Sequence, residues 1–309
     1  MSQSGSRTCL TAATTIPDIS GAQSYPSRPI RLIVPFAARG PSDSAARTLG
    51  EALSKRLDQA FVIENRPGAD GLLAGQSVLS APVDGHTLLF HGSSLIPLPL
   101  LKSPPPFDLL TDLAPVSMTT LLEWALYVSP HVPAKSIAEL VEYARANPGK
   151  LSYATSNLSE RLASEQFLKT AGIEMVRVPY KGFAQVLPDL MAARVHMNVA
   201  PLSAVLPYAK DGRVRLLAVL TLQRSRFAPD VSTLREAGVA HGPIPGWQAV
   251  FDRLNFEIGQ SLLDTHVVMQ FERLSTQVHG STVEELAGTI RDDVRTWSEF
   301  IRQYAIAAE

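Results

Sequence analysis

The sequence predicts an α/β protein built from two doubly wound domains, with a cleft between them and two hinge strands that join them. Three observations support this fold class. The length of 309 residues corresponds to about two domains. From residue 29 onward, short apolar runs typical of buried strands alternate with helical patterns, which favours parallel sheets. Two further apolar runs stand where the chain would pass from one such series to the other and back.

The first series begins with residues 30–36, a continuous apolar run broken only by Arg31, as expected of a strand covered on both faces. A helix capped by Ser42 or Asp43 follows, because its alanines and leucines recur on one face. The series continues with a strand at 61–64, a helix at 70–81 and a strand at 87–90. This βαβαβ order predicts a parallel sheet with right-handed crossovers.

The second series begins after residues 115–129, a long apolar run that we interpret as a strand crossing into a second domain. Ser136 and Glu139 have the spacing of a capping box and open a helix that extends to about residue 146. The elements expected next are strands at 151–155, 175–179, 195–199 and 214–220, helices at 160–171, 183–193 and 203–210 between them, and a short helix at 233–237.

A returning strand at 247–251 and an amphipathic helix at 283–304 complete the expected elements. Two crossings between the series imply a two-lobed molecule. The predicted division is a leader at 1–24, domain I at 25–118 plus 248–309, and domain II at 119–247.

The leader has weak features of an export signal. It contains one positive charge, Arg7, and a short apolar stretch at 9–13, which makes a poor signal peptide. Its end, at residues 22–24, has the small-residue spacing of a cleavage site. Two interpretations stay open: a degraded or mis-started signal, and a plain N-terminus without a signal.

Charge, cysteine content and hydropathy exclude several classes of function. Lys plus Arg against Asp plus Glu gives 28 − 29 = −1, so no global positive field draws the chain to nucleic acid or to an anionic membrane. The single cysteine, Cys9, excludes an internal disulfide, a cysteine-ligated zinc and an iron–sulfur cluster. No apolar run reaches the roughly 18 residues that a membrane-spanning helix needs.

Four loops carry the most informative pattern, because each joins an expected strand to an expected helix through small residues. They lie at 36–43, 92–95, 155–159 and 180–183. In a parallel sheet such loops share the carboxyl edge, where helix N-termini present free amides. A ring of amides binds carboxylate or phosphate without a cationic side chain. The alternative is that each loop only makes a tight turn, but four loops facing one ligand cleft favour a binding site.

Enzymatic and metal sites have little support. The loop at 39–43 fits no nucleotide-binding glycine pattern, the loop at 92–95 lacks the second glycine of a nucleophile elbow, and the seven histidines form no pair with metal-ligand spacing. Asp43 could be a general base, although a carboxylate at a helix start usually caps the helix. The enzyme alternative is an α/β transferase or hydrolase with Ser93, Asp43 or Lys181 as the reactive group. It requires a nucleophile and a base within reach, and the sequence offers no such pair.

A series of motifs gives a more specific indication. In order they are YPSRPIRLIVPF (25–36), GPSD (40–43), VIENRPGA (62–69), DGHTLL (84–89), DLAPV (112–116), NPGKL (147–151), VPYKG (178–182), GRVRLLAV (212–219) and EAG (236–238). This series resembles the Bug family, the TctC-like solute-binding proteins of tripartite tricarboxylate transporters. The resemblance runs from Tyr25 to the C-terminus and implies the periplasmic binding protein type 2 fold.

The resemblance also implies a function. Two domains would close on a small carboxylate, such as a di- or tricarboxylate, an amino acid or an aromatic acid, and deliver it to membrane permease subunits. Loop amides, hydroxyls and ordered water would hold the carboxylate. The candidate ligand-binding residues are Phe36, Ala37, Ala38, Arg39, Gly40, Ser42, Asp43, Gly92, Ser93, Ser94, Thr155, Ser156, Asn157, Tyr180, Lys181, Gly182 and Ala200. We expect a periplasmic monomer with no catalytic residue, cofactor, metal or nucleic-acid partner.

Several positions depart from the family pattern. Arg39 stands in a loop that is normally glycine-rich, residues 156–160 read SNLSE where a Gly/Ser/Thr mixture is usual, and Ala200 replaces a common acidic residue. After residue 251 the start of a capped helix is missing. These departures leave open a degenerate family member that acts as a sensor or an interaction protein.

Overall fold

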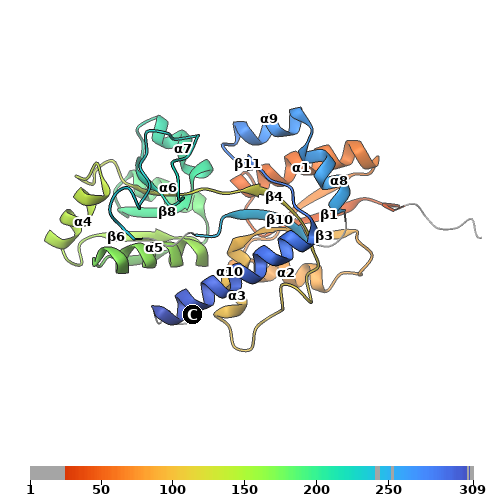
Figure 1. The fold of residues 1–309 in the computed structure, drawn as a ribbon, viewed down its shortest axis with the longest axis horizontal. Helices are drawn as coiled ribbons and strands as arrows, with labels where there is room; N and C mark the ends of the chain where they lie inside the picture. Colours follow the sequence, from red (N-terminus) through yellow and green to blue (C-terminus); the bar gives the residue numbers. More distant parts are fainter. Residues whose placement is uncertain (1–24, 241–243, 252–253, 305, 307–309) are drawn as a thin grey trace, which may run out of the picture.

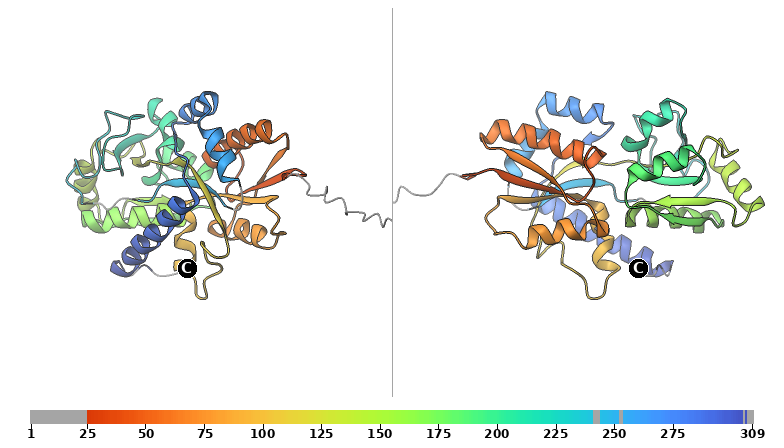
Figure 2. Two further views of the ribbon diagram at one scale, coloured as in Figure 1. Left: turned by 45° about the vertical axis from the view of Figure 1, so that its right-hand side comes forward. Right: turned by 180° about the vertical axis from the view of Figure 1, so that it is seen from behind.

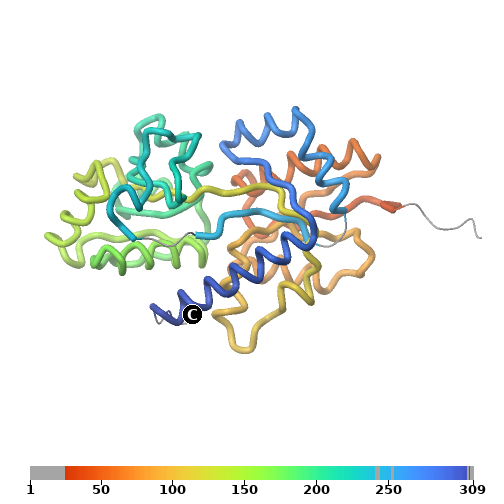
Figure 3. Tube along the Cα trace, in the orientation of Figure 1, coloured from red at the N-terminus to blue at the C-terminus, as the bar shows by residue number. Residues whose placement is uncertain are grey.

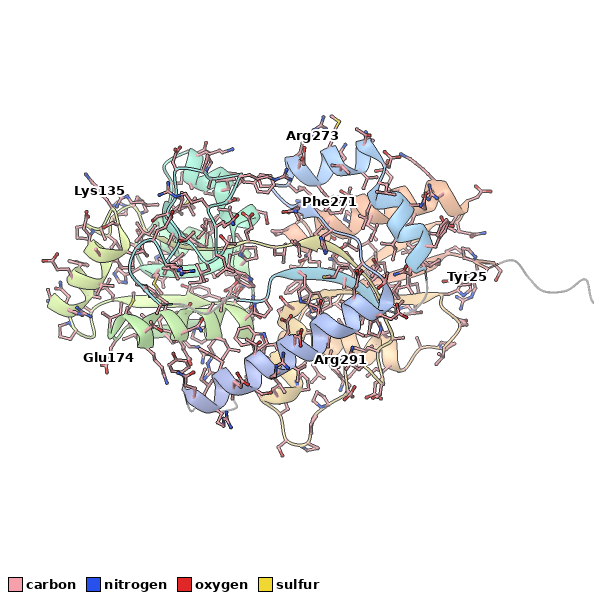
Figure 4. All side chains as sticks on the ribbon, viewed as in Figure 1. Tyr25, Lys135, Glu174, Phe271, Arg273 and Arg291 are labelled. Atoms are coloured by element: carbon pink, nitrogen blue, oxygen red, sulfur yellow. The ribbon has the colours of Figure 1, made fainter. Side chains whose placement is uncertain are left out.

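In the computed structural model, residues 25–240, 244–251, 254–304 and 306 are described, so the leader with Cys9 lies outside the described residues. A six-stranded and a five-stranded sheet form the centres of two lobes that lie side by side (Figure 1). Figure 4 marks Lys135 and Glu174 in the lobe of the five-stranded sheet and Tyr25 at the far end of the other lobe. Among the described residues, no helix has the length and apolar character needed to cross a membrane.

The six-stranded sheet of domain I has the order β11-β4-β10-β3-β1-β2. Strands β3, β1 and β2 are parallel to one another, whereas β10 runs antiparallel between β3 and β4. The strands are β1 (Ile30–Val34), β2 (Phe61–Asn65), β3 (Thr87–Gly92), β4 (Pro115–Leu121), β10 (Trp247–Phe251) and β11 (Gln277–Val278). The helices are α1 (Pro41–Leu57), α2 (Leu72–Leu79), α3 (Pro97–Leu100), α8 (Asn255–Leu262), α9 (Thr265–Arg273) and α10 (Val283–Gln303), with the 3-10 turns η1 (Ala69–Gly71) and η2 (Ser93–Leu95).

The five-stranded sheet of domain II has the order β7-β6-β8-β5-β9, with β7, β6 and β8 parallel and β5 antiparallel to both its neighbours. The strands are β5 (Trp124–Val128), β6 (Ser152–Thr155), β7 (Val176–Pro179), β8 (Met197–Pro201) and β9 (Arg215–Val219). The helices are α4 (Ile137–Ala146), α5 (Leu158–Ala171), α6 (Phe183–Met191) and α7 (Leu202–Lys210). The predicted α/β class with two doubly wound sheets is confirmed.

The chain passes between the sheets twice, and the two passages run side by side (Figure 3). The expected single strand at 115–129 is two strands, β4 in one sheet and β5 in the other, so the predicted boundary after residue 118 lies within β4. On the return, Trp247 pairs with Leu121, and the Leu122 amide donates to the Gly246 carbonyl at 2.7 Å. These passages are the hinge segments, which we define as residues 121–124 and 244–247.

The start of α1 corrects the sequence prediction. Pro41 occupies the first helical position, and Gly40 is the N-cap with no side-chain cap, so neither Ser42 nor Asp43 caps the helix. Proline suits this position because its missing N–H would have no helical partner there. The polar side chains of the first turn are therefore available for other contacts.

The capping box predicted at Ser136 is only half formed. The Ser136 hydroxyl accepts from the Glu139 amide at 3.2 Å, but Glu139 Oε2 accepts from the Lys135 amide instead of the Ser136 amide. Complete boxes lie at α10, between Thr282 and Glu285, and between Thr233 and Glu236. These devices satisfy amides that the helix leaves unpaired.

Two further segments are short or irregular at one end. The helix expected at 233–237 is a single turn, because the chain leaves it at Gly238, whose left-handed φ of 80° ends the helix. Helix α8 begins at Asn255, and its N-cap, Leu254, has a φ of 108° and no side-chain cap. The predicted lack of a capped helix start after residue 251 agrees with this geometry.

One hydrophobic cluster joins the two lobes. Leu158 and Leu162 at the start of α5 pack with Leu95, Ile96 and Leu98 of domain I. The C-terminal part of α10 also reaches domain II, where Lys169 Nζ donates to the Tyr304 carbonyl (Figure 2). The start of α5 is therefore buried against domain I.

Candidate functional site

The four loops that the sequence singles out all follow parallel strands. Two follow β1 and β3, which are neighbours in the domain I sheet, and two follow β6 and β7, which are neighbours in the domain II sheet. Neighbouring parallel strands bring their carboxyl ends to one edge. The topology thus gathers the candidate residues in pairs of loops, one pair on each domain.

The β1–α1 loop is organised around the buried carboxylate of Asp43. Its Oδ2 accepts from the Arg39 amide at 2.8 Å and from Arg47 Nε at 3.0 Å, and its Oδ1 accepts from Asn65 Nδ2 at 3.0 Å. Burial acts to raise the pKa of Asp43, but these hydrogen bonds together hold it below its ordinary value. Asp43 is an ionised loop anchor, and this arrangement gives no support to Asp43 as a general base.

The exposed part of this loop is Ala37, Ala38 and Arg39. Phe36 is half-buried, and its carbonyl accepts from the Asn65 side chain at 3.0 Å. Arg39 adopts a φ of 66°, in the left-handed region that favours glycine. Among the described residues, its guanidinium has no hydrogen bond or ion pair.

Ser42 connects the loop to the hinge. Its hydroxyl accepts from Gln248 Nε2 at 2.7 Å, while Gln248 Oε1 accepts from Thr120 Oγ1 at 3.1 Å. Gln248 is buried in β10 and Thr120 in β4. One side chain therefore joins the first candidate loop to both strands that lead to the hinge segments.

The β3 loop packs directly on the hinge segments. Gly92 has no room for a side chain, because a Cβ there would lie 2.4 Å from the Trp247 carbonyl oxygen. Ser93 is buried and its hydroxyl donates to the Pro245 carbonyl at 2.8 Å, the same oxygen that accepts from Trp124 Nε1 at 3.1 Å. Ser94 is half-buried. Ser93 thus faces a carbonyl acceptor and not a base that could activate it as a nucleophile.

The β6–α5 loop holds a carboxylate of its own chain. Asn157 is the N-cap of α5, and the Glu160 carboxylate accepts from the Ser156 amide, the Ser156 hydroxyl and Asn157 Nδ2. Thr155 is buried, with its hydroxyl accepting from Arg177 Nε at 3.3 Å. This loop is therefore fixed from within domain II before any ligand binds.

Glu160 is the last member of a buried series of hydrogen-bonded polar side chains that crosses the domain II sheet. Asn198 Nδ2 of β8 donates to the Ala154 carbonyl at 2.8 Å and to Glu160 Oε2 at 3.4 Å, and Asn198 Oδ1 accepts from the Tyr127 hydroxyl of β5. Burial raises the pKa of Glu160 to about 7 against the hydrogen bonds that lower it. Burial also raises the pKa of Tyr127, so Tyr127 stays a neutral donor.

The β7–α6 loop is more exposed. The Tyr180 hydroxyl donates to Asp189 Oδ2 at 2.9 Å, and burial followed by this bond raises the pKa of Tyr180 to about 12. The Lys181 side chain is exposed, and its amide donates to Gln185 Oε1 at 3.3 Å. Gly182 has extended backbone with open space beside it. Neither Tyr180 nor Lys181 lies in an arrangement that would activate a nucleophile.

Ala200 is the candidate that the structure places away from a loop surface. It lies in β8, pairs with Ala125, and is fully buried in the second hydrophobic cluster of domain II. The sequence interpretation placed it after a strand ending at 199, but β8 extends to Pro201. Its methyl group therefore packs in the core and not on a loop surface, and a binding role for Ala200 stays a prediction.

The loops after β3 and β6 meet at the domain interface. Leu95 of the loop at 92–95 and Leu158 of the loop at 155–159 both belong to the cluster that joins the lobes. Two open cavities of about 450 and 570 Å³ lie elsewhere, one beside α2 and one beside α7. In the described part of the chain, no cluster of three or more His, Cys, Asp or Glu could hold a metal ion.

The sequence did not single out three buried polar residues that contact the candidate loops or lie beside them: Glu160, Asn198 and Gln248. A signal existed for Glu160, because Asn157 and Glu160 have the spacing of an N-cap and its third helical residue. No local pattern marks Asn198 or Gln248, which lie in apolar strands and acquire their roles only through neighbouring strands.

Comparison with known proteins identifies this architecture. A family model described as "Tripartite tricarboxylate transporter family receptor" matches residues 45–253. The chain belongs to this family. A member from Pseudomonas sp. (strain P51), the UPF0065 protein in the tcbD-tcbE intergenic region, is 32% identical over 297 residues, which cover 92% of this chain and 88% of the relative. The resemblance to the Bug family is confirmed.

Solved structures of this family share the fold. The periplasmic binding protein BugD superposes with a TM-score of 0.86 at 25% identity, covering 92% of this chain and 100% of that protein. An R. palustris protein solved with adipate has a TM-score of 0.86 at 29% identity, covering 92% and 99%. The chain is thus a Bug-type solute-binding protein of two domains and not an enzyme, and its structural relative BugD is a periplasmic binding protein.

Proposed function

We propose that this family member binds a small carboxylate between its two domains and delivers it to the permease subunits of a tripartite transporter. The observation that carries the proposal is the position of the β3 and β6 loops, which meet at the domain interface. The adipate-bound relative supports a carboxylate as the ligand class. The ligand contacts we propose come from the loops at 36–43, 92–94, 155–157 and 180–182.

The proposed setting is the periplasm, with the protein acting as a monomer and without nucleic acid. The family supports the periplasmic setting, because its solved members include periplasmic binding proteins. Fractionation of cells that express the full chain tests export. Because the leader is a poor signal, we expect inefficient processing. A fully processed periplasmic product would show that the leader is a competent signal.

A thermal-shift screen against mono-, di- and tricarboxylates and aromatic acids tests binding. A ligand at 100 times its dissociation constant should add about 2.7 kcal/mol to the free energy of unfolding. Mass spectrometry should return the best ligand unchanged after incubation. If no carboxylate stabilises the protein, the proposal is wrong; if the ligand is converted, the family assignment does not describe this chain's activity.

A further inference from the structure

The β6–α5 loop already binds a carboxylate. Glu160 Oε2 accepts from the Ser156 amide at 2.7 Å and from Asn198 Nδ2 at 3.4 Å. Glu160 Oε1 accepts from the Ser156 hydroxyl at 2.9 Å and from Asn157 Nδ2 at 3.0 Å. All four partners donate, which is the arrangement that an ionised carboxylate requires. The loop donors that the sequence analysis assigned to a ligand are therefore occupied by the chain itself.

The position of this carboxylate gives it influence over the ligand. Ser156 and Asn157 are proposed ligand contacts, and the next residue, Leu158, packs against domain I. Glu160 is buried, is hydrogen-bonded to both residues and, in the described part of the chain, pairs with no basic side chain. A second negative charge placed against this loop would repel an unneutralised buried carboxylate, and the repulsion is strong where water is excluded.

We propose that Glu160 determines ligand specificity: its ionised carboxylate occupies the donors of the β6–α5 loop and keeps a second ligand carboxylate out of the domain II side. The chain then prefers monocarboxylates to dicarboxylates of the same length while Glu160 is ionised. This inference rests on the proposed function and names the substrate class within it.

Protonation of Glu160 removes this discrimination. A protonated carboxyl carries no charge and becomes a donor through one oxygen, which releases the Ser156 hydroxyl for another acceptor. Since burial raises the pKa of Glu160 to about 7, the change occurs near neutral pH. A dicarboxylate bound against the loop favours the protonated form, so its binding is coupled to proton uptake.

The surroundings leave Glu160 as the group that titrates here. Tyr127 of β5 is the titratable side chain that interacts with it, and burial keeps Tyr127 neutral. Strand β8, η2 and α3 contribute no ionisable side chain. On α5 itself, Arg161 Nε donates to Glu165 at 2.8 Å. Tyr153 of β6 interacts with Glu165, Arg177 and Arg161 and not with Glu160.

Hexanoate and adipate provide a matched test, because they have six carbons and differ by one carboxylate. Calorimetry measures both dissociation constants in wild-type protein at about pH 8.5 and about pH 6, where both ligands are largely ionised. We expect hexanoate to bind about tenfold more tightly than adipate at the higher pH, since a tenfold change corresponds to about 1.4 kcal/mol. The preference should fall several-fold at the lower pH.

Glu160→Gln removes the charge and should raise adipate affinity about tenfold at the higher pH while abolishing the pH dependence of the preference. Glu165→Gln, on the same helix, is the control and should behave as wild type. If Glu160→Gln does not fold, the pH dependence of the hexanoate-to-adipate preference in wild-type protein is the test of the proposal.

The outcomes separate the two proposals. A hexanoate-to-adipate preference that is the same at both pH values, or a preference for adipate at the higher pH, overturns the role of Glu160 and leaves carboxylate binding intact. If wild-type protein binds neither these acids nor any carboxylate of the thermal-shift panel, the proposed function fails and this inference fails with it.

Discussion

Asp43, His91 and Glu160 are buried ionisable side chains in or directly beside the candidate loops, and their surroundings differ. Asp43 has an arginine partner and stays ionised, whereas Glu160 has only neutral donors and titrates near neutral pH. His91 Nδ1 accepts from the Gly92 amide at 2.7 Å, and Nε2 has no partner in the described structure. Burial lowers the pKa of His91 to about 3.

Glu160 and His91 should give the stability opposite dependences on pH. Between about 4.5, its unfolded value, and about 7, folded Glu160 keeps a proton that the unfolded chain has lost, so its contribution to stability falls as pH rises. Between about pH 6.5 and pH 3, His91 is protonated in the unfolded chain but stays neutral in the folded protein. Its contribution to stability therefore falls as pH falls. From 4.5 to 6.5 the two trends oppose each other.

Urea unfolding of variants across this range separates the two groups. The free energy of unfolding of Glu160→Gln, relative to that of wild type, should increase by roughly 1.4 kcal/mol per pH unit as pH rises from about 4.5 to 7. His91→Asn keeps an acceptor for the Gly92 amide. Its free energy of unfolding should increase relative to that of wild type as pH falls below about 6.5. Parallel curves for wild type and Glu160→Gln would contradict the raised pKa.

Three interpretations of Arg39 can be distinguished by experiment. The side chain pairs with a second ligand carboxylate, it points to solvent without a role in binding, or its backbone conformation is strained. Its φ of 66° favours strain, because a side chain in the left-handed region costs on the order of 1 kcal/mol. We expect Arg39→Gly to raise the free energy of unfolding by about that amount and Arg39→Gln to leave it unchanged. Loss of selectivity between mono- and dicarboxylates in both variants would instead support pairing with the ligand.

At the scale of elements, the hinge segments approach each other too closely for side chains at two glycines. A Cβ on Gly246 would lie 2.0 Å from the Leu122 carbonyl oxygen, and one on Gly92 would lie 2.4 Å from that of Trp247. In both cases the obstructing atom belongs to backbone, which cannot move aside like a flexible side chain. The β3 loop and both hinge segments are therefore packed as one unit.

Alanine substitution tests this packing. Gly246→Ala should lower the free energy of unfolding by about 2 kcal/mol or more, because it forces two backbone segments apart. Gly259→Ala, in α8 with open space around it, should raise the free energy by about 0.5 to 1 kcal/mol through helix propensity. Denaturant midpoints measure both. A neutral Gly246→Ala would show that the hinge segments are not in contact in solution.

At the scale of the whole molecule, the lobes contact each other through a buried cluster at α5 and through an exposed ion pair, at 3.3 Å, between Arg226 of domain II and Glu272 of α9. The start of α5 packs on η2 and α3, and α10 extends from domain I to α5, so this side is closed by apolar and polar contacts (Figure 2). Leu162 is fully buried within this cluster. Because the buried contacts lie on the α5 side and an exposed ion pair such as Arg226–Glu272 contributes little, we expect closure of the domains to pivot about the α5 side.

Removing the pivot contact should loosen the domains. Leu162→Ala and Leu190→Ala each truncate a fully buried leucine, at the interface and in the domain II core respectively, and each should cost about 2 to 5 kcal/mol. Only Leu162→Ala should increase the radius of gyration of the ligand-free protein, measured by small-angle X-ray scattering. An unchanged radius, or an equal increase in both variants, would contradict the pivot.

The sequence by itself determined the order of strands and helices, because local periodicity and capping residues act within a few positions of each other. The strand at 247–251 and the helix beginning at residue 283 have the predicted starts. The positions of the four loops also follow from this order, since parallel strands must end at a common edge. Local rules failed at residues 115–129, where one apolar run is divided into β4 and β5, because the two strands pair in different sheets.

Only the tertiary structure decided which side chains of the loops remain available to a ligand. Ser93 and Ser156 have the same chemistry in the sequence, but one donates to the Pro245 carbonyl and the other to Glu160. Ala200 was assigned to a loop and lies in the core. The physical reason is that a hydrogen bond satisfies whichever partner the fold brings within about 3 Å, and the partners Pro245, Gln248 and Asn198 come from distant strands and hinge segments.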